Sequence, residues 1–304
     1  ARQRDGSVLF WSLRNPDFPE KCIATPSGVT AIDFSQAHPN LLAVGMYTGA
    51  IAIYDTAKEK ELGNVVLANA DRAGAGAGGV AAPLVESSTS AGKHTEAVWQ
   101  VKWVNKGAER GEGLVSISTD GRVIEWSIKK GLTFTPLMLL KRTGASGASA
   151  AAAIHAACCI TGTGNTDGVI SRQASGLSFD FPVGDSTVYL TATEDGAIHK
   201  CSTSYSEQYL ETYRGQAGPV YRVRTSPFWA AAFLSCGADW TARLWELRRT
   251  APVHTFSSDL SDGVNDVAWS PTNATVFASV AGDGRLELWD LERSTLDPVV
   301  RVFP

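Results

Sequence analysis

The sequence has few of the residue patterns that mark a redox, metal-binding or membrane protein. Its five cysteines form no CxxC pair and are odd in number, so we expect no disulfide framework and a reducing compartment. The five histidines are scattered, with no pair at metal-ligand spacing. No apolar run approaches the ~18 to 20 residues that span a bilayer, and the first residues form no apolar signal-peptide core. We therefore expect a cytosolic chain with no metal, no cofactor and no membrane partner.

An excess of basic charge is also missing. The 27 Lys and Arg residues are outnumbered by 31 Asp and Glu, which gives a net charge of -4 over 304 residues. Proteins that neutralise phosphates need a basic surface, so nucleic acid is not expected as the main partner. A hydrophobic fraction of 44% and an aromatic fraction of 9% are instead typical of a globular chain with a sizeable core.

An internal repeat is the strongest signal in the sequence. Each repeat begins with a two-residue tight turn, and a short strand of alternating apolar and polar residues follows it. The strand ends in one large residue, or in Cys201, five positions after the second residue of the turn. The pattern occurs six times: Asp5-Gly6 with Trp11, Thr48-Gly49 with Tyr54, Asp120-Gly121 with Trp126, Asp195-Gly196 with Cys201, Asp239-Trp240 with Trp245, and Asp283-Gly284 with Trp289.

Two further strands precede five of these units, and a weaker outer strand follows, as in residues 208–213 and 253–256. Four strands per unit predict an all-β fold, a WD40 β-propeller of four-stranded blades. Three of the five intervals between strand endings are 43 or 44 residues, within the ~40 to 45 residues of a WD repeat. The other two, 72 and 75 residues, require insertions.

The insertions are visible as low-complexity segments. One covers about 69–92 and is predicted to be a mobile loop; the other covers about 143–176, and its structure stays open. We interpret residues 1–304 as one WD-repeat β-propeller domain whose first blade is incomplete. Seven blades are expected in the full protein, so flanking residues are predicted to complete the ring.

Polar residues of the third unit resemble the hydrogen-bonded network of WD repeats. His94, Ser116 or Ser118, Asp120 and Trp126 are predicted to bond in series within one blade, which stiffens the sheet. Equivalent structural positions in later units are Asp195, Asp239, Trp245, Asp283 and Trp289. A catalytic Ser-His-Asp triad is the alternative, but no Gly-x-Ser-x-Gly elbow accompanies these serines. We therefore predict no catalytic residue.

A second motif formally suggests a nucleotide site. Residues 74–79 contain a GxGxxG pattern, but they lie in Gly/Ala low complexity and no helix-forming segment follows. A dinucleotide cofactor is therefore not expected.

Large residues in turns are the candidates for partner binding, because blade interiors are filled by packing residues. Trp240 takes the turn position where the other units have Gly, and Tyr47 lies beside an equivalent turn. Both are expected on one face, and Phe228 and Trp229 on the opposite face. The alternative is that each ring packs on the neighbouring blade.

Several segments resemble the axonemal dynein intermediate chains, most closely the outer-arm member. The most specific are WSLRNPDFPE at residues 11–20 and GKHTEAVWQVKW at residues 92–103. The others are residues 27–34, 38–39, 45–55, 201–210, 235–245 and 263–271.

The resemblance implies a non-catalytic subunit of the outer dynein arm. A heavy-chain tail would be bound by the propeller, and a second intermediate chain and light chains by segments outside this chain. It also implies the axoneme of a cilium or flagellum, with preassembly in the cytoplasm. Two alternatives remain: a generic WD-repeat adaptor in another cytosolic complex, and a propeller hydrolase.

Overall fold

The computed structural model describes residues 6–57, 83–87, 92–107, 111–128, 131–142, 173–257 and 262–303. These residues form strands and turns and no helix, which confirms the all-β prediction. Within the same ranges, no helix is long and apolar enough to cross a membrane.

The strands form six antiparallel sheets, and each strand pairs with its neighbour in the chain. The first sheet has two strands, β1 (Gly6–Phe10) and β2 (Lys21–Thr25). The other five have four strands each. They are β3 (Val29–Phe34), β4 (Leu41–Met46), β5 (Ile51–Asp55) and β6 (Val85–Glu86); β7 (Val98–Asn105), β8 (Glu112–Ser118), β9 (Arg122–Ser127) and β10 (Thr133–Leu139); β11 (Gly176–Asp180), β12 (Val188–Thr193), β13 (Ala197–Ser202) and β14 (Glu211–Arg214); β15 (Val220–Thr225), β16 (Ala232–Gly237), β17 (Ala242–Glu246) and β18 (His254–Phe256); and β19 (Val264–Trp269), β20 (Val276–Ala281), β21 (Leu286–Asp290) and β22 (Val300–Val302).

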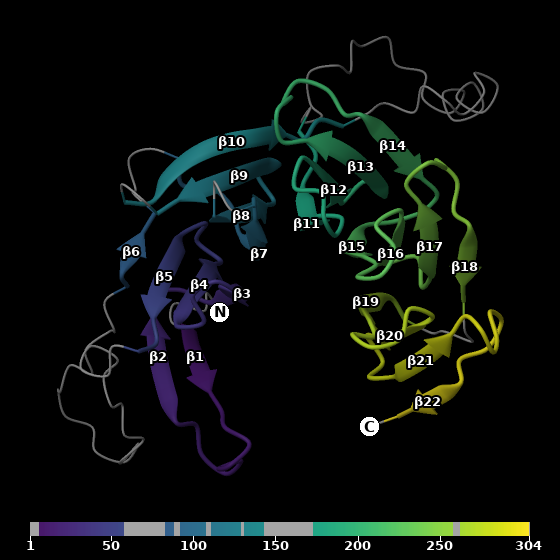
Figure 1. Ribbon diagram of the computed structural model, residues 1–304, viewed down its shortest axis with the longest axis horizontal. Coiled ribbons are helices and arrows are strands. Elements are labelled where there is room, and N and C mark those ends of the chain that lie inside the picture. The colour runs from purple at the N-terminus through teal and green to yellow at the C-terminus, as the bar shows by residue number, and fades with distance from the viewer. Residues whose placement is uncertain are drawn as a thin grey trace, which may run out of the picture.

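The sheets follow one another around an arc, with β7, β11, β15 and β19 toward its centre and β10, β14 and β18 at its periphery (Figure 1). This radial order of four-stranded sheets is that of a propeller. The arc is open between the sheet of β1 and β2 and the sheet that ends with β22 (Figure 1). Completion of the ring by flanking residues stays a prediction, as does the count of seven blades.

Five of the six predicted tight turns join the second and third strands of their sheets; in the sixth, Gly6 begins β1 and Asp5 lies outside the described residues. Gly49, Gly121, Gly196 and Gly284 have φ between 75° and 89°, the left-handed region that glycine adopts without a steric penalty. A Cβ at Gly121 would lie 2.6 Å from the carbonyl oxygen of Ala174, so this turn is packed against the chain entering the next sheet. The turns therefore hold neighbouring sheets together.

A β-bulge recurs near the start of all five innermost strands, where one residue is left out of the pairing register. Such bulges redirect a side chain away from the sheet face. The residues concerned are Thr30, Trp99, Leu177, Tyr221 and Asn265. Trp99 and Tyr221 are exposed. The sequence pattern alone does not predict these bulges.

The core lies between the sheets. The indoles of Trp126, Trp245 and Trp289 are fully buried, and Trp245 stacks on Phe233 at 5.9 Å with an interplanar angle of 3°. Trp11 is the exception to the expected burial of strand-ending rings, because it follows a two-stranded sheet and its ring is more than half exposed.

The prediction of a loop over the whole of 69–92 was wrong in part. β6 lies inside it and forms the outer strand of its sheet, and Ser87 accepts a hydrogen bond from the backbone N–H of Ile51 at 3.0 Å. Ala174 and Gly176, in the second predicted insertion, are also buried parts of the fold. Residues 69–82, 88–91 and 143–172 lie outside the described residues.

Carboxylates on innermost strands bond to the next four-stranded sheet along the arc. Asp33 in β3 accepts the backbone N–H of Trp103 in β7 at 2.7 Å. Asp180 in β11 accepts the backbone N–H and the hydroxyl of Thr225 in β15 at 2.7 and 2.8 Å, and it also forms an ion pair with Lys102. Asp180 therefore ties its own sheet to both neighbouring sheets.

We predict that Asp180→Ala lowers the free energy of unfolding by about 3 kcal/mol, because the change leaves a buried N–H and the Lys102 ammonium unpaired. Urea denaturation followed by tryptophan fluorescence measures this. Asp17→Ala, at an exposed carboxylate, is the matched control and should change the value by less than ~0.5 kcal/mol. Equal effects of the two variants would contradict the inter-sheet role of Asp180.

Candidate interaction surfaces and the His94 network

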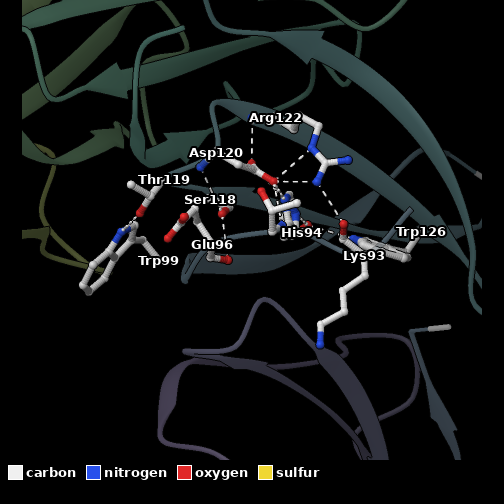
Figure 2. Close-up of polar contacts among 11 residues, drawn as sticks. Lys93, His94, Glu96, Trp99, Ser118, Thr119, Asp120, Arg122 and Trp126 are labelled. Atoms are coloured by element: carbon white, nitrogen blue, oxygen red, sulfur yellow. Dashed lines mark hydrogen bonds and ion pairs between the residues drawn. The ribbon is translucent and has the colours of Figure 1, made fainter. Parts of the chain in front are cut away.

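The structure brings His94, Ser116, Asp120 and Trp126 together, and we call these four residues the His94 network. Figure 2 shows His94, Asp120 and Trp126 of this network. The His94 Nδ1 atom lies 3.1 Å from both carboxylate oxygens of Asp120, and its Nε2 atom lies 2.8 Å from the Ser116 hydroxyl. Trp126 donates its indole N–H to the same hydroxyl at 2.8 Å. Because a carboxylate can only accept, Nδ1 donates to Asp120 and Nε2 accepts from Ser116.

Ser118, the alternative serine, has a different function in the same blade. Its hydroxyl donates to the carbonyl oxygen of Glu96 at 3.0 Å and accepts the backbone N–H of Asp120 at 3.3 Å. Arg122 completes the arrangement with a two-nitrogen contact to Asp120 at 2.9 and 2.7 Å, and it also donates to the carbonyl oxygen of Lys93 (Figure 2). The loop before β7 is therefore fixed to the turn between β8 and β9.

The electrostatics of the network favour an ionised Asp120. Burial by itself raises the pKa of this carboxyl, but the hydrogen bonds from His94 and from the backbone and side chain of Arg122 outweigh burial and hold the pKa well below its usual range. Ser116 and His94 are both buried. A nucleophile needs an accessible oxygen, so this geometry favours a structural function for the network over catalysis.

Later units contain parts of the same arrangement. Trp245 donates to Ser235 at 2.8 Å and Trp289 to Ser279 at 3.0 Å, while Asp239 and Asp283 form ion pairs with Arg243 and Arg285. In the sheet of β15 to β18, which we call the fifth sheet, the backbone N–H of Ala217 donates to the carboxylate of Asp239. The backbone N–H of Thr95 donates to Asp120 in the same way. Gln216 therefore stands where His94 stands.

Gln216 is buried, and neither polar atom of its side-chain amide has a hydrogen-bond partner among the described residues. A buried amide without partners costs on the order of 1–3 kcal/mol. This sheet thus has Ser235, Asp239 and Trp245 in place of Ser116, Asp120 and Trp126, but it has no histidine to join the serine to the aspartate. The sequence analysis did not single out Gln216, because its spacing to Asp239 differs from that of His94 to Asp120.

The unit with Cys201 uses different contacts. Asp195 accepts the hydroxyl of Thr193 in its turn, and the buried Cys201 thiol lies 3.8 Å from the hydroxyl of Thr191. His199 stacks on Tyr209 at 3.8 Å, and burial lowers the pKa of His199 to about 4. A ring pair here occupies space near the position that a terminal tryptophan takes in other sheets.

The four candidate partner-binding residues lie at opposite ends of the strands. Trp240 and Tyr47 are in turns that follow β16 and β4, whereas Phe228 and Trp229 are in the loop before β16. All four side chains are exposed, and no ring contact joins them to another described aromatic ring. Partner binding by these four residues stays a prediction, as does the alternative that each ring packs on a neighbouring blade.

Trp240 is exceptional in its backbone. Its φ is 65°, and it is the one residue other than glycine with positive φ in the described ranges. This conformation costs a side chain on the order of 1–2 kcal/mol. Its ring is 52% exposed, so packing does not explain why the strain is retained.

Known proteins resemble one repeat of this chain and also the chain over nearly its whole length. The family "WD domain, G-beta repeat" matches residues 250–290, which run from the outer strand β18 to β21 of the next sheet. The chain is 44% identical to dynein axonemal intermediate chain 4 of Xenopus laevis over 305 residues, covering 99% of this chain and 37% of the relative.

Two further relatives have the same kind of name. Dynein intermediate chain 2, ciliary, of Heliocidaris crassispina is 34% identical over 98% of this chain and 38% of its own length. The 78 kDa intermediate chain of the flagellar outer arm of Chlamydomonas reinhardtii is 31% identical over 98% of this chain and 39% of its own. The chain is a homologue of the axonemal dynein intermediate chains. It spans less than two fifths of the length of these relatives.

In this intermediate-chain homologue, we predict that Gln216→His raises the free energy of unfolding by about 1–2 kcal/mol. The imidazole would join Asp239 to Ser235 and remove the unpartnered amide. Urea denaturation measures the change. Gln208→His, at an exposed position, is the control and should have little effect; destabilisation by the first variant would contradict the network interpretation.

The lowered pKa of Asp120 predicts an acid-dependent loss of stability. Its stabilising contribution is present above the unfolded pKa near 3.8 and is lost as the pH falls toward the folded pKa. Asp120→Asn removes this contribution. The free energy of unfolding of the variant should therefore be lower than that of the unmodified chain by about 3 kcal/mol at pH 7, and by less at pH 3.

Urea midpoints at the two pH values test this prediction, with Asp297→Asn at an exposed carboxylate as the control. A difference between the Asp120 variant and the unmodified chain that is the same at both pH values would show that ionisation of Asp120 does not stabilise the fold.

Proposed function

We propose that this chain is a non-catalytic scaffold of an axonemal outer dynein arm and that it binds a dynein heavy-chain tail. The sequence similarity to axonemal dynein intermediate chains over nearly the whole chain supports the proposal, and one relative is named for the flagellar outer arm. Rigid sheets with exposed rims suit a scaffold, because recognition can use the turns without disturbing the core.

The same proposal covers the remaining expected partners and the location. A second intermediate chain and light chains would bind segments outside this chain. The assembly would function in the axoneme of a cilium or flagellum after preassembly in the cytoplasm, and it would support motility. Nucleic acid and membrane are not proposed as partners.

The strained turn at Trp240 supports one particular surface for this function. An exposed indole in a conformation that glycine adopts more easily is disfavoured for folding alone. Tryptophan is enriched among the residues that dominate binding energy. We therefore propose that the turn face with Trp240 and Tyr47 contacts the heavy-chain tail, with Phe228 and Trp229 offering a second surface on the opposite side.

Trp240→Gly separates folding from binding. Glycine relieves the positive φ, so we expect the melting temperature to stay the same or rise, while co-purification with the heavy-chain tail falls at least tenfold. Trp240→Ala keeps the strained backbone and should lose binding without gaining stability. Trp229→Ala tests the opposite surface by the same measurement.

The outcomes separate the surface from the function. Unaltered binding by the Trp240 variants would remove this turn from the interface. If the intact protein binds no heavy-chain tail, the alternative of a WD-repeat adaptor in another complex replaces the dynein-arm proposal.

A further inference from the structure

A pocket of about 310 Å³ lies among the innermost strands β3, β7 and β15. It is separate from the Trp240 turn and from the His94 network. Its ionisable lining residues are Lys102, Arg222, Arg224 and Asp33, so three cationic side chains share the space with one carboxylate. The pocket is therefore lined by charges of both signs, and the cation available to a ligand is set by the partners of each.

Two of the cations are held in place by their own partners. Lys102 forms an ion pair with Asp180, and Arg222 donates to Asp266 at 3.2 Å. Arg222 also reaches the side-chain oxygen of Gln100 in β7 at 3.4 Å. These contacts fix the positions of the two positive charges before any ligand arrives.

Arg224 differs from both. Among the described residues, its guanidinium has no hydrogen bond and no ion pair, although the residue is only partly exposed and its charge lies near Asp33. The Oδ2 atom of Asp33 already accepts a hydrogen bond from the backbone N–H of Trp103 at 2.7 Å. A guanidinium presents donors in a planar fork that matches a carboxylate in two-bond geometry.

An apolar wall completes the pocket. The indole of Trp99 lines it, and its orientation is fixed because its N–H donates to the Thr119 hydroxyl at 2.6 Å. Ile32 lines the pocket as well and is more than half exposed. A flat ring and an aliphatic side chain suit the methylene groups of a glutamate side chain.

We propose that this pocket binds a carboxylate, supplied by a glutamate side chain of an acidic peptide segment. The carboxylate accepts two hydrogen bonds from Arg224, whose guanidinium forms no ion pair with a described residue, and the methylene groups contact Trp99. The proposal does not depend on the dynein arm, because the recognition chemistry belongs to this chain alone.

Binding of fluorescein-labelled hexaglutamate to the purified full-length protein, followed by anisotropy, tests the proposal. We expect saturable binding that weakens with salt, and no binding of hexalysine. Arg224→Gln should weaken hexaglutamate binding about tenfold or more, as expected for loss of a charge-assisted contact. Arg249→Gln, at an exposed arginine in another part of the fifth sheet, should leave the affinity unchanged.

A second variant guards against a folding defect. Arg224→Lys keeps the charge but loses the two-bond geometry, so an intermediate affinity is expected. Free glutarate is added as a competitor of labelled hexaglutamate. If glutarate displaces the label at the same concentration as unlabelled hexaglutamate does, the site binds a small carboxylate and not a peptide. No saturable binding by the intact protein, or equal affinities of the intact protein and the folded Arg224→Gln variant, would overturn the proposal.

Discussion

Both faces of the central strands in this molecule are apolar, and neither face can be left in water without a large loss of free energy. In β4 and β16, nearly every residue is buried regardless of which side it points to. A sheet of this kind needs a neighbour on each side. Radial stacking supplies both neighbours, so the arc follows from the sequence of the inner strands more than from any single contact.

Packing of apolar faces alone leaves the position of one sheet against the next loosely determined. Polar contacts between the sheets determine this position further. Asp33 and Asp180 connect innermost strands of adjacent sheets. The indoles of Trp103 and Trp269 each donate to a carbonyl oxygen of the preceding four-stranded sheet at 3.1 Å. The His94 network is confined to one blade, but it fixes a turn that contacts the chain entering the next sheet. Satisfied polar groups therefore set the geometry that apolar burial stabilises.

The sequence allowed prediction of the features that repeat with a fixed spacing. The tight turns, the strands that end in Trp126, Trp245 and Trp289, and the four-stranded sheets all follow from hydrophobic alternation and turn chemistry. The outer strands β6 and β10 were not found, because each has solvent on one side and tolerates a weak pattern. Neither the unpartnered amide of Gln216 nor the charges around Arg224 could be predicted, since both depend on residues distant in the sequence.

The bulge near the start of each innermost strand has an evolutionary consequence. Because the bypassed residue takes no place in the pairing register, a substitution there leaves the backbone ladder intact. In two sheets that residue is an exposed aromatic, Trp99 or Tyr221. Each four-stranded sheet thus offers one position where selection can alter a side chain without breaking the strand pairing, so one scaffold can acquire new binding preferences by single mutations.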